Sequence, residues 1–224
     1  MSLKKINTFV IRDGRITQGQ LKALESYYQK NTISIDALTP QDIFEHFGND
    51  NPIILEIGFG SGEHLIANAI KSPNINFLGL EVFKSGIGQV LNAIEEYKLP
   101  NIKVINHDAM ELLNHHISED LFTCIQILFP DPWPKKRHHK RRMINPDFIN
   151  LVSTKVLESG YLFLATDEKT YAEQIDDVLN NQNYFSSVLV DEVNEAYFYR
   201  SSTRFERRGI RLGNAITEWR LQKI

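Results

Sequence analysis

Three acidic residues, Glu56, Glu81 and Asp108, stand at the ends of successive apolar runs. The carboxyl ends of parallel strands meet at one edge of a sheet, so strands at these runs would point the three carboxylates into one crevice. A carboxylate there can bind ribose hydroxyls, and Asp108 is placed to accept a hydrogen bond from an adenine amino group. The pattern therefore predicts a nucleoside-binding crevice. For any single one of the three, a helix cap or a surface position is the alternative interpretation.

A glycine-rich turn, with Gly58, Gly60 and Gly62, follows the first of these runs. Such a turn lets the backbone approach a ligand closely. Glu63 occupies the third glycine position of a dinucleotide-binding turn, where its carboxylate would oppose a pyrophosphate. S-adenosyl-L-methionine carries a sulfonium cation and no phosphate, so an acidic crevice favours it as the cofactor over a nicotinamide dinucleotide.

Asp131 lies between two prolines in the segment FPDPWP. Proline restricts the backbone on both sides, so we expect Asp131 to project from a stiff loop at the mouth of the crevice. Trp133 offers a ring on which a nucleic-acid base can stack. The alternative interpretation is a proline-rich surface turn with Trp133 buried in the core.

The eight residues after this loop, KKRHHKRR, contain six lysines or arginines and two histidines. The whole chain has a net charge of −3, but screening confines electric fields to about 8 Å at physiological salt, so a local cluster can still hold a phosphate backbone. A solvated cationic loop is the alternative. The predicted RNA-binding residues are Lys136, Arg137, His138, His139, Lys140, Arg141 and Arg142, of which the two histidines would contact the backbone and not a metal.

The composition is that of a globular protein with one sizeable core, since 42% of the 224 residues are hydrophobic. No apolar run approaches the roughly 20 residues that cross a bilayer, and the first residues lack a secretory signal, so we expect a cytoplasmic protein without membrane contact. Cys124 is the single cysteine, which excludes an internal disulfide, and we expect no metal. Monomer and homodimer both remain open.

From residue 53 onward, short apolar runs alternate with helix-length stretches such as Glu63–Lys71 and Ser85–Lys98, which predicts βαβ units. No full helical stretch separates the last two runs, so they should form an antiparallel hairpin. We expect an α/β, Rossmann-like and mostly parallel seven-stranded sheet with helices on both faces. The expected strands are Ile53–Ile57, Asn76–Glu81, Lys103–Asn106, Phe122–Leu128, Tyr161–Ala165, Ser187–Asp191 and Ala215–Leu221.

Residues 1–50 precede this domain, which we place at 51–224, as an extension of the same unit. The extension should contain a helix at Gln18–Lys30 and a second helix opened by Thr39 and Pro40. Phe9–Arg15 is either a strand or a flexible arm that carries Arg12 and Arg15 to RNA, and an arm that is merely solvated is the competing interpretation.

The motifs EIGFGSGEHL, GLE, HDA, FPDPWPKKRHHKRR, ATDE and TRFERRG, taken in order, resemble the bacterial tRNA (guanine-N7-)-methyltransferase family along the whole catalytic domain. FPDPWPKKRHHKRR is the specific motif, whereas the glycine turn is shared by most enzymes that use S-adenosylmethionine. The resemblance implies a class I methyltransferase fold and methylation of the variable-loop guanine of tRNA. It also implies that Glu56, Glu81, Asp108 and Asp131 surround the cofactor, and that Lys135, Asp167, Thr203, Arg204, Phe205 and Glu206 surround the substrate.

Guanine N7 already presents a lone pair, so methyl transfer to it needs accurate placement and no strong base. Positive charge develops on the guanine, and we assign its stabilisation to Asp131, with Asp167 as the second candidate. For Asp167 a helix N-cap is the competing interpretation, and Glu206 could simply pair with a neighbouring arginine. Methylation of another RNA or of an amine, and a non-catalytic RNA-binding module, are the alternative functions.

Overall fold

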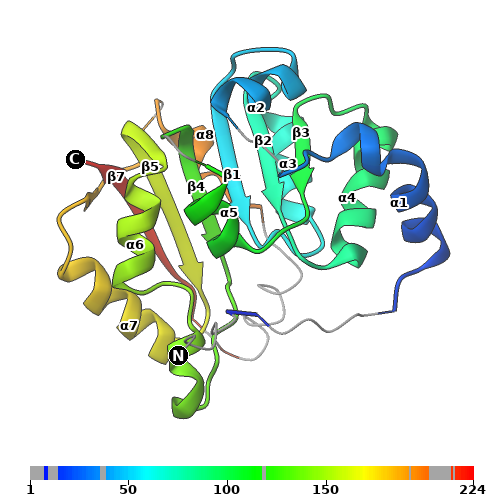
Figure 1. The fold of residues 1–224 in the computed structure, drawn as a ribbon. Coiled ribbons are helices and arrows are strands. Elements are labelled where there is room, and N and C mark those ends of the chain that lie inside the picture. The colour runs from blue at the N-terminus through cyan, green and yellow to red at the C-terminus, as the bar shows by residue number, and fades with distance from the viewer. Residues whose placement is uncertain are drawn as a thin grey trace.

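Seven strands form one sheet in the order β3-β2-β1-β4-β5-β7-β6 (Figure 1). The structure is a computed structural model that describes residues 8–9, 15–35, 39–117, 120–191, 193–201, 213 and 215–224. The strands are β1 Ile53–Ile57, β2 Asn76–Leu80, β3 Ile102–Ile105, β4 Phe122–Leu128, β5 Val156–Thr166, β6 Phe185–Ser187 and β7 Thr217–Lys223. The pairs among β1 to β5 are parallel, whereas β7 runs antiparallel to β5 and β6. The predicted mostly parallel sheet with a C-terminal hairpin is confirmed.

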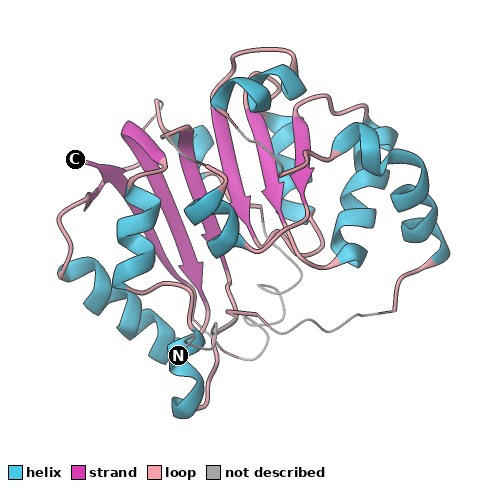
Figure 2. Cartoon of the chain, in the orientation of Figure 1, coloured by secondary structure: helices cyan, strands magenta, loops and turns pink. Residues whose placement is uncertain are grey.

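Helices cover both faces of this sheet (Figure 2), because alternate strand residues are buried on opposite sides. Leu55 packs in one apolar cluster with residues of α2, α5, α6 and α7, and its neighbour Ile54 packs in the other with residues of α1, α3, α4 and α8. The helices are α1 Gln18–Asn31, α2 Pro40–Phe47, α3 Glu63–Lys71, α4 Lys84–Tyr97, α5 Ala109–His115, α6 Pro146–Ser153, α7 Lys169–Asn180 and α8 Glu195–Phe198, with a 3-10 helix η1 at Lys136–Arg141.

The described residues of the extension lie directly on the sheet and its helices. Thr39 caps α2, its side chain accepting from the Asp42 N–H while the Asp42 side chain accepts in return, as expected for this sequence. Helix α1 packs against α4, where Lys30 donates to Glu95 at 2.7 Å. Beyond α1, the Ile33 N–H donates to the Val104 carbonyl of β3. The expected strand Phe9–Arg15 falls mostly outside the described residues.

Strands β5 and β6 differ most from their predicted bounds, whereas β2, β3 and β7 are shifted by only one or two residues at an end. Strand β5 begins at Val156, before the expected Tyr161, and keeps Ser159 within the strand at φ 60°, opposite a register shift between Phe122 and Cys124. The sequence at this irregularity resembles that of a turn, which is why the predicted strand begins only after it. Strand β6 ends at Ser187, and the apolar run after it leaves the sheet, with Leu189 88% exposed. Apolar residues there favoured a strand, but contact with β7 ends just after Ser187, where the Val188 N–H donates to the Arg220 carbonyl at 3.0 Å.

Gly88 marks a close approach between α4 and α1. A Cβ atom at Gly88 would lie 2.8 Å from the Gln20 carbonyl oxygen, whereas a Cβ at Gly19, an exposed residue of α1, would meet nothing within 4 Å. We expect Gly88→Ala to lower the free energy of unfolding by about 1–3 kcal/mol, since backbone would have to move. Gly19→Ala should leave it unchanged or raise it slightly. Urea unfolding of both variants measures this, and equal stability of the two would show that the helices are not so closely packed.

Candidate functional site

A cavity of about 240 Å³ opens at the carboxyl ends of β1, β2 and β4. Strand order reverses between β1 and β4, and a crevice at such a point is where open α/β sheets bind ligands. Glu81 and Asp131 both line the cavity, as predicted, together with Gly58 and Gly60. Apolar walls surround these groups, formed by Leu80, Val82, Phe83, Ile127 and Phe129.

The glycine turn presents bare backbone to this cavity. Gly58 and Gly60 have φ values of 74° and 56°, in the left-handed region that favours glycine, and a Cβ at either would meet nothing within 4 Å. On its other side the turn touches α4, because a Cβ at Gly86 would lie 2.0 Å from the Gly60 carbonyl oxygen. Gly62, also predicted for the cofactor, caps α3 at φ 75°. The turn is therefore fixed by packing on one side and open on the other.

Glu81 is buried and accepts hydrogen bonds from three backbone N–H groups. Its Oε2 accepts from Gly60 at 2.8 Å, and its Oε1 accepts from Val82 at 2.7 Å and Phe83 at 3.1 Å. Burial raises the pKa of Glu81 above its ordinary value, although the three N–H donors oppose that rise. A carboxylate has about four acceptor positions, so Oε2 keeps one for a ligand hydroxyl.

Glu56 is directed at a buried histidine, His64, that sequence reasoning left without a role. Glu56 Oε2 lies 3.0 Å from His64 Nδ1, and His64 Nε2 lies 3.1 Å from the Tyr199 carbonyl oxygen. Burial opposes a charged imidazole, but the charge of Glu56 and these hydrogen bonds outweigh it and raise the pKa of His64. Glu56 is not among the residues that line the cavity, so the geometry gives it a supporting place beneath the turn.

The segment Tyr197–Arg200 lies on the sheet face that α3 covers, and residues 202–212 come soon after it in the chain. Gln126 donates from Nε2 to the Tyr197 carbonyl at 2.8 Å, and Arg200 donates from Nε to Glu218 at 2.7 Å. Together with His64, strands β4 and β7 therefore fix this segment. The predicted substrate residues Thr203, Arg204, Phe205 and Glu206 come just after it and lie outside the described residues.

Asp108 caps α5, its side chain accepting from the Glu111 N–H at 2.9 Å. Its neighbours His107 and Ala109 line the cavity, whereas Asp108 does not. The capping alternative thus applies to this one of the three acids, and a contact of Asp108 with the cofactor stays a prediction. His107 is a lining residue that sequence reasoning missed.

The loop FPDPWP has two residues in the left-handed region, Phe129 at φ 55° and Trp133 at φ 45°. Asp131 is exposed between them at the cavity. Trp133 is half-buried and not in the core; its Nε1 donates to the Thr8 carbonyl at 2.9 Å, and the Arg141 guanidinium lies 4.5 Å above its ring. Thr8 also lines the cavity, a contribution of the N-terminal arm that no sequence signal indicated.

Most of the basic run faces solvent. Lys135, Lys136, Arg137 and Lys140 are exposed, and His138, His139 and Arg141 are half-buried. Slight burial and the surrounding cations lower the pKa of His138, so its imidazole is largely neutral at neutral pH.

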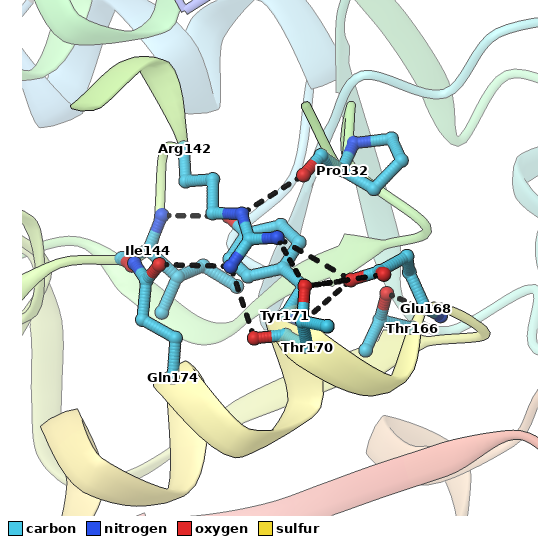
Figure 3. Close-up of polar contacts among 8 residues, drawn as sticks. All are labelled: Pro132, Arg142, Ile144, Thr166, Glu168, Thr170, Tyr171 and Gln174. Carbon is cyan, nitrogen blue, oxygen red and sulfur yellow. Dashed lines mark hydrogen bonds and ion pairs between the residues drawn. The ribbon is translucent and has the colours of Figure 1, made fainter. Parts of the chain in front are cut away.

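The prediction that Arg142 binds phosphate is wrong for this structure. Arg142 is 2% exposed, and its guanidinium points inward at Pro132 and at the first turns of α7 (Figure 3).

The cap of α7 is Glu168, whose side chain accepts from the Tyr171 N–H. Asp167 is therefore not the helix cap, and its proposed place at the substrate remains a prediction.

Among the described residues, no three His, Cys, Asp or Glu side chains are grouped so that they could hold a metal ion. None of the described helices is long and apolar enough to span a membrane.

The comparisons of the sequence with known proteins all indicate the same family. A family model described as a putative methyltransferase matches residues 50–219. A tRNA (guanine-N(7)-)-methyltransferase of Legionella pneumophila is 40% identical over 222 residues, covering 96% of this chain and 96% of that protein. The protein of the same name from Francisella philomiragia is 39% identical and covers 100% of this chain and 97% of that protein.

Solved structures share the fold at low sequence identity. An antibiotic-related methyltransferase has a TM-score of 0.57 at 19% identity, covering 86% of this chain and 96% of its own. TrmN from Thermus thermophilus has a TM-score of 0.54 at 16% identity, covering 92% of this chain and 52% of its own. A putative methyltransferase from Streptococcus mutans in complex with SAH has a TM-score of 0.50 at 10% identity, covering 84% and 99%.

The buried Glu56–His64 pair should make stability depend on pH. The pKa of His64 is higher in the folded than in the unfolded chain, so the pair's contribution is complete below the unfolded pKa and is lost as pH rises through the folded pKa. We expect the difference in free energy of unfolding between the wild type and His64→Gln to shrink as pH is raised from about 6 to about 9. Denaturant unfolding across this range measures it, with His46→Gln, at an exposed position of α2, as control. A pH-independent difference would contradict the charged pair.

Proposed function

We propose that this chain, which belongs to the tRNA (guanine-N(7)-)-methyltransferase family, methylates N7 of a guanine in tRNA. The observation that carries the proposal is one of proximity. The acidic cavity at the sheet edge is lined by Asp131, and only four residues later the chain enters the exposed cationic run. A cofactor pocket, a carboxylate and a phosphate-binding surface thus stand side by side.

The cavity fits S-adenosyl-L-methionine as the methyl donor. Its described lining contains the carboxylates of Glu81 and Asp131 and no lysine or arginine, which suits a cationic nucleoside without phosphates. When bound, this cofactor supplies an activated methyl group on a sulfonium sulfur, and its transfer leaves S-adenosylhomocysteine. Glu81 would hold the ribose hydroxyls through the free position of Oε2, and the bare backbone at Gly58 and Gly60 would border the ligand.

Asp131 acts on the base in this proposal. Guanine N7 offers a lone pair, so the protein contributes by holding that nitrogen in line with the methyl group. As N7 becomes methylated, the guanine ring gains positive charge, which the exposed Asp131 carboxylate stabilises while it accepts hydrogen bonds from N1–H and the amino group. Asp167 and the residues Thr203, Arg204, Phe205 and Glu206 complete the proposed substrate site.

The cationic run holds the tRNA backbone. N7 faces the major groove, which in A-form helices is too deep and narrow for side chains, so the target guanine must lie in irregular RNA. Lys135, Lys136, Arg137, Lys140 and Arg141 would grip phosphates on either side of it. Such a substrate implies action in the cytoplasm.

Removal of the charge at Asp131 should slow methyl transfer. We expect Asp131→Asn to reduce kcat/KM for unmodified tRNA by about 100-fold or more, a loss typical of a removed electrostatic stabiliser. Labelled methyl incorporation and alkali-labile scission at N7-methylguanine measure the effect. Asp177→Asn, at an exposed acid of α7, is the control. Unchanged kcat/KM in Asp131→Asn would remove the residue from the mechanism.

The affinity for tRNA should fall as salt rises. Each lost phosphate contact reduces the slope of log affinity against log salt by about 0.7–0.9, so Lys136→Gln should flatten the slope by that amount. Lys22→Gln, at an exposed lysine of α1, should keep the wild-type slope. Filter binding at several salt concentrations distinguishes the two, and a wild-type affinity that is insensitive to salt would contradict the assignment of the cationic run.

A further inference from the structure

Arg142 ends the basic run but differs from its neighbours in where its charge lies. Its side chain is 1% exposed, and its guanidinium carbon lies 4.8 Å from the centre of the Tyr171 ring. Arginine has five N–H donors. A buried guanidinium would be costly unless these donors found acceptors.

All five donors have acceptors within the protein (Figure 3). Nε donates to the Pro132 carbonyl at 2.8 Å. Nη1 donates to the Thr170 carbonyl at 2.9 Å and to Gln174 Oε1 at 3.0 Å. Nη2 donates to Thr170 Oγ1 at 2.7 Å and to Glu168 Oε2 at 3.4 Å. No donor is left for a phosphate.

These acceptors lie beside the two candidate acids of the substrate site. Pro132 directly follows Asp131, and Glu168 directly follows Asp167. The link is reinforced next to Arg142, where the Ile144 N–H donates to the Tyr171 hydroxyl at 2.9 Å and Gln174 donates to the Ile144 carbonyl at 3.1 Å. The prolines of the Asp131 loop carry no N–H, so they cannot hold the loop by donating hydrogen bonds. A donor from outside the loop, here Arg142 Nε to the Pro132 carbonyl, can fix it instead.

We propose that Arg142 is a positioning residue for methyl transfer, which fixes the Asp131 loop against the beginning of α7 so that Asp131 and Asp167 face the same guanine. The inference rests on the proposed function. Arg142 acts on the rate and not on RNA affinity, in contrast to Arg141, whose guanidinium lies over Trp133 at the surface. A lysine cannot replace it, because an ammonium lacks the planar fork that reaches acceptors in several directions.

The test compares Arg142→Lys and Arg142→Ala with Arg141→Gln in the full chain. For the two Arg142 variants we expect kcat at least tenfold below wild type, with a tRNA Kd within about twofold of it at fixed salt. Arg141→Gln should instead weaken tRNA binding. Added guanidinium chloride at millimolar concentration should restore part of kcat in Arg142→Ala, whereas sodium chloride at the same ionic strength should not.

Spectroscopy separates positioning from a general loss of fold. The chain has two tryptophans, so Trp219→Phe leaves Trp133 as the sole reporter of the loop, and Arg142→Lys should shift its emission while far-ultraviolet circular dichroism stays native. If Arg142 variants do not fold, Thr170→Val and Gln174→Met, each of which removes one side-chain acceptor, should give folded proteins with kcat lowered and tRNA Kd kept.

Wild-type kcat in folded Arg142→Lys, or in both acceptor variants, would overturn the inference. So would a loss confined to tRNA Kd. If the wild-type protein itself transfers no methyl group to tRNA although it binds S-adenosylmethionine, the proposed function fails, and that result is distinct from the failure of Arg142 alone.

Discussion

The change of direction in strand order between β1 and β4 is the constraint on which the rest of the molecule depends. The chain builds outward through β2 and β3, and then returns to add β4 on the other side of β1. The connections that follow β1 and β4 diverge, so no crossover fills the space beyond their carboxyl ends. The glycine turn after β1 and the proline-bounded loop after β4 therefore border one cavity, although more than 60 residues separate them in the sequence.

An acidic site and a basic surface lie close together in this fold. They can do so because the acid is buried in the crevice and the cations are in water. Glu81 lies inside the crevice, where backbone N–H groups of Gly60, Val82 and Phe83 satisfy its carboxylate without neutralising it. The cations of η1 lie outside, in water, where screening limits their reach. The net charge of −3 for the whole chain thus conceals an acidic pocket for a cationic ligand and a basic surface for a polyanion.

Sequence reasoning succeeded where the signal is local. The cap at Thr39, the open backbone of the glycine turn and the final antiparallel pair each follow from neighbouring residues. It failed where a partner is distant: nothing near Arg142 indicates that Gln174, 32 positions away, accepts from it, and nothing near His64 indicates the Tyr199 carbonyl. Asp167 and Glu168 both suit a helix cap, so the sequence alone does not choose between them. Glu168 is the cap because α7 begins at Lys169.

The inward turn of Arg142 divides a uniform-looking basic stretch into parts that tolerate different kinds of change. The outer lysines and arginines face solvent, so one cation can replace another there with little consequence for the fold. The span from Pro132 to Arg142 has a fixed length, because its ends meet through a 2.8 Å hydrogen bond. Insertion or deletion of a single residue within η1 would carry the guanidinium away from its acceptors, so relatives should vary in the identity of these charges but not in their number of positions.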